Sequence, residues 1–285
     1  AKSGTANFYN GVATQSLRID NSASALLTRT PSAGNRKTWV WSAWIKKCDA
    51  SSTSQDLFTA EGSGAQLFAI QILSNDKIQV YGASAVLLLS NQLLRDTSAW
   101  YHIAVASDTT QATATNRLKV YLNGSEVTSF TTDNRASYAQ DTDYGINSNV
   151  KHNIGSNQAG GNFLDAYISE VNFIDGLSFF SDTSGTANTS FNINSFGETK
   201  NGVWIPVAYT GSYGTQGFHL EFKETGDGSS TASSSTIGAD TANSNHYKDT
   251  NLDAYDSNMP DSPENNFPTM NPLALGADGT LSEGN

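Results

Sequence analysis

The chain has 285 residues and is acidic, with 27 aspartates and glutamates against 16 lysines and arginines and a formal net charge of −11. That balance argues against a nucleic-acid-binding protein, which needs clustered lysine and arginine to neutralise phosphates. The single cysteine, Cys48, excludes an intrachain disulfide framework, and no run approaches the roughly 18 apolar residues of a membrane span, so we expect no membrane insertion.

From Ser16 to about Asp175, apolar residues fall in short runs bounded by Gly, Asn, Asp and Ser, which is typical of short strands joined by turns. Helical periodicity is almost absent, so the pattern predicts an all-β domain. The predicted strands are Ser16 to Ile19, Ala25 to Thr30, Thr38 to Lys46, Asp56 to Ala60, Ala65 to Leu73, Lys77 to Tyr81, Val86 to Ser90, Trp100 to Ser107, Arg117 to Leu122, Glu126 to Phe130, His152 to Gly155 and Phe163 to Phe173.

Two of these strands carry additional signals. The segment Leu118 to Leu122 is followed by Asn123-Gly124, a pair that supplies the positive φ angles of a type I′ hairpin turn. We therefore predict a hairpin there, with one buried face and one solvent-exposed face. The strand from Thr38 has large apolar side chains on both faces, which predicts a central strand covered on both sides.

The composition changes after Gly176. Ser181 to Ser190 is small and polar, Phe196 to Phe222 is denser in apolar residues, and Thr225 to Asp261 is polar with few core-forming residues. Such a polar stretch buries too little apolar surface to order alone, so we expect it to lie over another surface or to be mobile. We accordingly predict a β-sandwich over residues 1–180 and an irregular C-terminal extension over residues 181–285, which serves packing or assembly.

Catalytic motifs are weak in this sequence. The best carboxylate pair for a glycosidase is Asp165 and Glu170, but an odd spacing of five residues on a regular strand puts the two on opposite faces. None of the four histidines has a neighbouring Ser or Cys in a nucleophile motif, and no zinc-ligand spacing occurs. We therefore expect a protein that is not an enzyme.

We expect no cofactor from the sequence, with calcium as the one alternative. Asp141 and Asp143, with Asn147 and Asn149 close behind, form the densest run of oxygen ligands inside the strand-rich region. The run does not match an EF-hand loop. Asp141 and Asp143 are thus candidate calcium ligands, with a plain solvated loop as the alternative.

A candidate sugar site comes from aromatic and amide side chains that gather in the loops before the strand at Phe163. Sugar-binding sites on such folds combine aromatic faces with amide or carboxylate groups. The candidate residues are Tyr138, Tyr144, Asn147, Asn157, Gln158 and Asn162. Exposed Tyr and Asn are also common in any β-protein, so ordinary loop residues are the alternative.

Five short segments occur in the order seen in laminin-G-like, concanavalin A-like jelly-roll domains. They are Ser16 to Asp20, Trp39 to Lys46, Ala99 to Ile103, Val120 to Gly124 and Ile168 to Val171. The chain resembles this family over roughly residues 10 to 180. The resemblance implies an antiparallel jelly-roll β-sandwich, but it carries no binding site because the fold serves many partners.

A second set of segments resembles structural proteins of marine tailed phages. It comprises Phe8 to Gly11, Arg95 to His102, Glu170 to Gly176, Tyr209 to Gly214 and Asp261 to Phe267. This resemblance implies a virion part such as a tail fibre, a spike or a capsid appendage, with other virion proteins as partners. The first residues lack the order of a signal peptide, so we expect synthesis in a bacterial host cytoplasm before assembly into the virion.

The expected function is therefore that of an oligomeric phage virion protein that binds host-surface glycans through a lectin-like β-sandwich. Several copies on one particle would raise avidity without a tight single site. Three alternatives stay open: a free carbohydrate-binding lectin or adhesin, a glycoside hydrolase of the same architecture, and a capsid decoration protein without a ligand.

Overall fold

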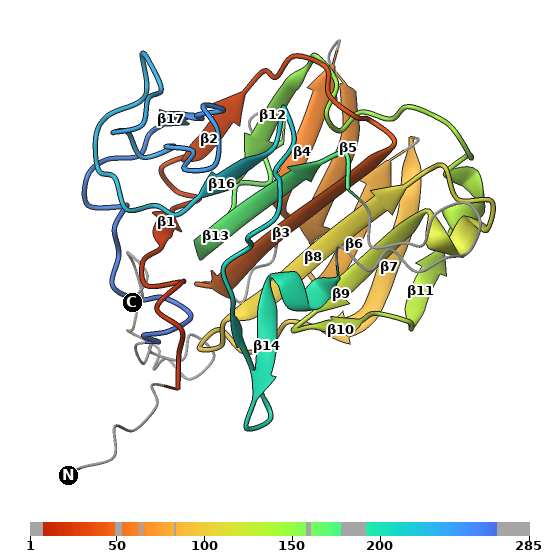
Figure 1. Cartoon of the computed structure of the whole chain (residues 1–285), viewed down its shortest axis with the longest axis horizontal. Helices are drawn as coiled ribbons and strands as arrows, with labels where there is room; N and C mark the ends of the chain where they lie inside the picture. Colours follow the sequence, from red (N-terminus) through yellow and green to blue (C-terminus); the bar gives the residue numbers. More distant parts are fainter. Residues whose placement is uncertain are drawn as a thin grey trace.

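Figure 1 shows the computed structural model of the chain, which describes residues 8–48, 53–62, 65–82, 84–157, 161–177 and 192–266. In these ranges the only helical pieces are three short 3-10 turns, η1 (Ala114–Asn116), η2 (Arg135–Ser137) and η3 (Ile193–Ser195). No helix in this part of the chain is long and apolar enough to cross a membrane. The expected all-β, antiparallel jelly-roll sandwich is confirmed.

One of the two large sheets contains seven of the described strands. Their order is β1–β13–β3–β8–β9–β10, and β16 also pairs with β13. All pairings are antiparallel. The strands are β1 (Leu17–Ile19), β3 (Thr38–Lys47), β8 (Tyr101–Asp108), β9 (Leu118–Leu122), β10 (Ser125–Glu126), β13 (Ala166–Asp175) and β16 (Phe218–Leu220).

The facing sheet contains eight of the described strands, in the order β11–β7–β6–β5–β4–β12–β2–β17. They are β2 (Leu26–Arg29), β4 (Gln55–Gly62), β5 (Ala65–Ile72), β6 (Lys77–Gly82), β7 (Ala85–Leu93), β11 (Phe130–Asp133), β12 (Lys151–Ile154) and β17 (Lys248–Thr250). A separate hairpin joins β14 (Gly197–Lys200) and β15 (Val203–Pro206). In Figure 1 this hairpin projects from one side of the sandwich.

The main core lies between the two sheets. Trp39 and Trp41 of β3 point into it, where the Trp41 ring stacks on Phe58 of β4 with centroids 6.0 Å apart. On the opposite face of β3, Val40 packs in a second cluster that includes Phe196. The C-terminal part of the chain thus covers the outer face of β3, and the prediction of a central strand buried on both sides is confirmed.

The predicted hairpin is also confirmed. Asn123 and Gly124 connect β9 to β10 with φ angles of 47° and 77°, and Leu122 pairs with Ser125. The Trp204 ring of β15 packs directly over this turn, because a β-carbon placed on Gly124 would lie 2.5 Å from it. Glycine at this position therefore meets both a backbone and a steric requirement.

One predicted strand is wrong as a single element. The segment Glu126 to Phe130 divides between β10 in one sheet and β11 in the other. Val127 still donates its N–H to the Val120 carbonyl and is buried in the core, after which the chain crosses to the facing sheet. No Gly, Pro, Asn or Asp interrupts the segment, which is why the sequence pattern indicates one strand.

The C-terminal extension is built onto the sandwich along the side that carries β1, β2, β16 and β17 (Figure 1). Strand β16 pairs with β13 and β17 pairs with β2, so each large sheet gains a strand from the extension. The Glu264 carboxylate accepts the backbone N–H groups of Gly11, Val12 and Ala13. The polar stretch from Thr225 to Asp261 therefore lies over another surface, which is one of the two outcomes expected for it.

Candidate functional site

A pocket opens beside the end of the eight-stranded sheet, where β12, β2 and β17 lie side by side. Thr28 of β2 pairs with Asn153 of β12 on one side and with Lys248 of β17 on the other. Because side chains alternate between the two faces of a sheet, these three project to the same face. Lys151, two residues before Asn153 on β12, projects there as well, and Thr30 directly follows β2 and also lines the pocket.

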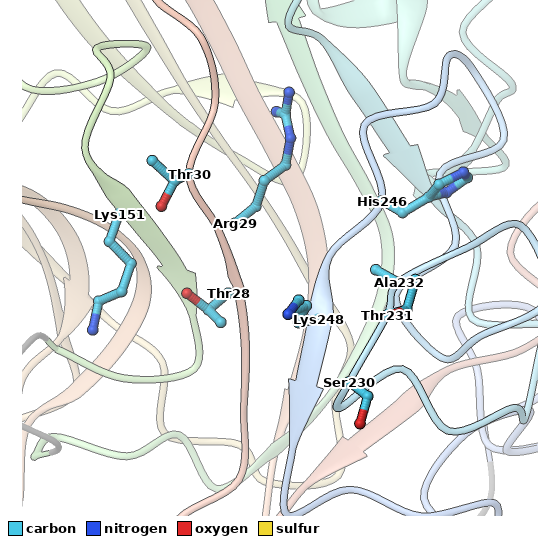
Figure 2. A pocket seen from close by; sticks show the side chains of 9 residues that line it. All are labelled: Thr28, Arg29, Thr30, Lys151, Ser230, Thr231, Ala232, His246 and Lys248. Carbon is cyan, nitrogen blue, oxygen red and sulfur yellow. The ribbon is translucent and has the colours of Figure 1, made fainter.

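The opposite wall of the pocket is a loop of the C-terminal extension that carries Ser230 and Thr231. The buried Asp249 carboxylate accepts the Gly228 N–H at 2.6 Å, and Gly226 bridges to Thr236 at the far end of the loop. The volume of this open pocket is about 670 Å³. The lining residues, shown in Figure 2, are Thr28, Arg29, Thr30, Lys151, Ser230, Thr231, Ala232, His246 and Lys248.

Two lysines flank Thr28 in the pocket, Lys151 on one side and Lys248 on the other (Figure 2). The Lys151 ammonium lies 3.3 Å from the buried carboxylate of Glu61, which sits on the neighbouring strand β4. Burial raises the pKa of Glu61, and the charge of Lys151 counteracts that shift. Lys248 is exposed and takes part in none of the ion pairs found among the described residues.

Two further basic side chains line the pocket. Arg29 donates to the side-chain oxygens of Gln216 and Asn245, which are neutral acceptors. Burial lowers the pKa of Arg29, and nearby Tyr247 and Asp240 counteract this. The Nδ1 atom of His246 accepts the Asp240 N–H at 2.9 Å, so the neutral ring carries its proton on Nε2. The polar lining therefore offers hydrogen-bond donors and positive charge.

The two predicted tyrosines lie together, away from this pocket. The Tyr138 and Tyr144 rings stack with centroids 4.1 Å apart. Tyr138 is fully buried and its hydroxyl lies 3.0 Å from the Ser107 hydroxyl, whereas the Tyr144 hydroxyl accepts the Ala139 N–H. No face of the Tyr138 ring reaches solvent. Its contacts with Tyr144 and Ser107 hold the loop that contains both tyrosines against the sheet.

The predicted asparagines hold loops together. The buried Asn147 amide donates to the Asn35 carbonyl and to the Asp175 carboxylate. Asn157 accepts the Gly161 N–H through its side-chain oxygen, and the Asn162 carbonyl accepts the Asp56 N–H. Gln158 lies outside the described residues. A ligand role for this set stays a prediction.

The predicted calcium ligands point into solvent. Asp141 is exposed and its carboxylate lies 3.7 Å from the Lys37 ammonium. Asp143 is exposed too, and its backbone carbonyl accepts a hydrogen bond from Arg36. Among the described residues, three metal-ligating groups converge elsewhere, at Glu170, His219 and Glu221.

One ligand atom from each residue of this triad lies within 4.8 Å of the others. The Glu170 carboxylate and His219 Nε2 are 2.7 Å apart, and Glu221 pairs with Lys223. Burial works to lower the pKa of His219, but the hydrogen bond and charge of Glu170 outweigh it and the pKa is raised. The pKa of Glu221 is lowered because Lys223 and His219 overcome the effect of its burial. Two carboxylates and an imidazole could hold a divalent cation or, without one, form an ion-pair cluster.

Asp165 and Glu170 do not lie on opposite faces, contrary to the prediction. Glu170 occupies a bulge in β13, with a φ of 51° and a register shift between Ser169 and Asn172. Ile168 faces the core before the bulge and Val171 faces it afterwards, so the alternation reverses at Glu170. Strand periodicity alone could not reveal this reversal. It also could not reveal the approach of His219, which is 49 residues away.

A buried serine and histidine pair does not form a nucleophile. Ser42 Oγ lies 2.7 Å from Nε2 of His102, and Trp204 donates its indole N–H to Nδ1 of the same ring. An indole nitrogen only donates, so Nδ1 is unprotonated and Nε2–H donates to Ser42. Burial lowers the pKa of His102 to about 3. Because the Nε2 atom already carries its proton, it cannot take one from Ser42.

Residues 20–178 match the laminin-G family model described as the concanavalin A-like lectin/glucanases superfamily. The chain belongs to this superfamily. A search of curated proteins finds no match. The superfamily match covers Thr28, Arg29, Thr30 and Lys151 of the pocket but ends before the residues at 230–248. This lectin-like domain thus has a pocket that its C-terminal extension completes.

Several solved structures resemble the lectin-like domain at low identity. A heptameric SAP-like pentraxin from Limulus polyphemus is 14% identical with a TM-score of 0.44, covering 67% of this chain and 83% of the pentraxin. A Trypanosoma rangeli sialidase is 15% identical with a TM-score of 0.36, covering 48% of this chain and 20% of the sialidase. Domain 4 of a Geobacillus stearothermophilus GH43 arabinanase, solved with arabinotriose, is 16% identical with a TM-score of 0.37, covering 50% and 63%.

Proposed function

We propose that this lectin-like domain binds a saccharide in the pocket between β2, β12, β17 and the loop at residues 230–232. The pocket itself is the observation that carries the proposal. Its volume of about 670 Å³ falls within the range of roughly 300 to 1,000 Å³ typical of small-molecule sites. Its lining combines hydroxyl groups with basic side chains, and these can hydrogen-bond the hydroxyl and ring oxygens of a sugar.

The proposed activity is binding without catalysis. Glycoside hydrolysis usually requires two carboxylates that flank the scissile bond. The described lining of the pocket includes neither Asp nor Glu. A saccharide held there would meet hydrogen-bond donors and cations but no acid–base pair, which favours a lectin over a glycosidase.

The biological setting that we propose is a phage virion. The resemblance of five segments to structural proteins of marine tailed phages supports a tail fibre, spike or capsid appendage, in contact with other virion proteins. As a homo-oligomer on the particle, the protein would attach to host-surface glycans through many weak contacts. A free lectin with the same pocket is the second candidate, and the position of the protein on a particle separates the two.

The proposed function can be tested by glycan-array binding of the full chain and of two tryptophan variants. Thr231→Trp places a large ring in the pocket, whereas Thr199→Trp changes an exposed threonine on β14. We expect array binding that Thr231→Trp abolishes and Thr199→Trp preserves. Arrays probed with and without a chelator test whether binding needs a divalent cation. Absence of binding to every glycan, or equal binding by both variants, would overturn the proposed pocket.

A further inference from the structure

The pocket has a charge opposite to that of the chain. The formal net charge is −11, yet Arg29, Lys151 and Lys248, three of the 16 lysines and arginines, line this one pocket. No carboxylate is among its described lining residues. A basic cavity in an acidic protein concentrates anions locally while the remaining surface repels them.

Lys248 contributes an uncompensated charge to the pocket. It is exposed on β17 and lacks an ion-pair partner among the residues that the structure describes, although the chain contains 27 aspartates and glutamates. Its position is fixed by the pairing of β17 with β2, which sets it directly beside Thr28. An ammonium placed in this way can form charge-assisted hydrogen bonds to a ligand anion.

Lys151 and Arg29 both have partners, and of the two Lys151 keeps a capacity for anions in this pocket. Glu61 contacts Lys151 from β4, and a lysine ammonium has three donors, so two remain for a ligand. Arg29 is directed away from these lysines, toward Gln216 and Asn245, and the charge of Asp240 acts on its guanidinium. With Glu61 offset by Lys151, the charge of Lys248 leaves the pocket positive.

The neutral part of the lining fits a sugar rather than a bare ion. Thr28 and Thr30 on the sheet side, and Ser230 and Thr231 on the loop side, present hydroxyl groups across the space. Asp249 holds the loop wall in place through Gly228. A volume of about 670 Å³ is far larger than a single phosphate or sulfate needs.

On these grounds, and resting on the proposed function, we infer that the pocket selects anionic saccharides whose sulfate or carboxylate groups contact Lys248 and Lys151. The test measures binding of the full chain to three defined oligosaccharides by calorimetry. These are carrageenan oligosaccharides, which are sulfated, alginate oligosaccharides, which are carboxylated, and agarose oligosaccharides, which are neutral. The first two arms distinguish the two sources of negative charge.

We expect at least one anionic oligosaccharide to bind more tightly than agarose, with an affinity that falls as salt is added. Lys248→Met should weaken this binding about tenfold, which corresponds to roughly 1.4 kcal/mol. Lys37→Met is the matched control because it removes one surface lysine outside the pocket. Unchanged thermal unfolding of both variants would show that the loss is local.

Three results would overturn the inference. If agarose binds as tightly as the anionic ligands and Lys248→Met has no effect, charge selection is wrong while saccharide binding stands. If both lysine variants weaken binding equally, the charge acts over the whole surface and not in this pocket. If none of the three oligosaccharides binds, the inference fails, and an empty glycan array would then remove the proposed function as well.

Discussion

At the residue scale, Glu170 has an unusual backbone and charge environment. Its backbone has a φ of 51° within a strand, a conformation that residues other than glycine rarely adopt. The bulge brings its carboxylate to His219 on β16, and Glu221 lies within reach of the same ring. The clustered charges thus join a strand of the sandwich to a strand of the C-terminal extension.

This contact predicts a pH dependence. Because the pKa of His219 is raised in the folded state, its charge stabilises the fold fully below about pH 6.5, the unfolded value. That contribution is lost as the pH rises through the folded pKa. Glu170→Gln should lower the pKa of His219 and cost about 1.5 to 3 kcal/mol of unfolding free energy at pH 5.5, but much less at pH 9. NMR titration and urea unfolding at both pH values measure these effects, and an unchanged His219 titration would contradict the prediction.

A second prediction at this scale concerns the buried pair of Lys46 and Asp261. Their charged atoms are 2.8 Å apart and both residues are buried, and Asp261 also accepts the Trp100 indole N–H. Asp261→Ala leaves a buried ammonium short of its countercharge, which should cost about 3 to 5 kcal/mol. The double variant Lys46→Met with Asp261→Leu should lose less. Urea unfolding compares the two, and a single variant more stable than the double one would contradict the prediction.

At the scale of elements, two glycines with left-handed backbones separate the effects of strain and packing. Gly124 (φ 77°) lies under the Trp204 ring, whereas a β-carbon on Gly202 (φ 82°) meets nothing within 4 Å. Gly202→Ala should therefore cost only the backbone strain, about 1 kcal/mol. Gly124→Ala should cost a further 1 to 3 kcal/mol or so, because Trp204 must move. Equal losses in urea unfolding would show that Trp204 does not restrict this turn.

The same elements show what could be predicted from the sequence. Asn123-Gly124 between apolar strands fixes a hairpin through local chemistry, and the tryptophans of β3 show burial on both faces. Strands β16 and β17 have three residues each and form by pairing with distant partners, so no local signal announces them. The pocket has no local sequence signal for the same reason. Thr28 and Lys248 become neighbours only when β17 pairs with β2.

At the scale of the whole molecule, the C-terminal extension contributes to the core as well as to the pocket. Phe218, Leu220, Phe222 and Tyr247 belong to the same buried cluster as the tryptophans of β3. The Phe218 ring stacks on Phe173 of β13 with centroids 5.5 Å apart. Without these side chains, part of the apolar surface between the sheets would face water.

The predicted boundary between the β-sandwich and the C-terminal extension can be tested with a shortened chain that ends at residue 180. It would lack β16 and β17, exposing the edges of β13 and β2, and it would lose both the Lys46 countercharge and the loop wall of the pocket. Unpaired strand edges and uncovered apolar surface promote aggregation. We therefore expect the shortened chain to aggregate or to unfold without a cooperative transition in calorimetry, whereas the full chain unfolds in one step. A soluble 1–180 chain with its own sharp transition would instead show that the sandwich is an independent domain and that the extension is an addition to it.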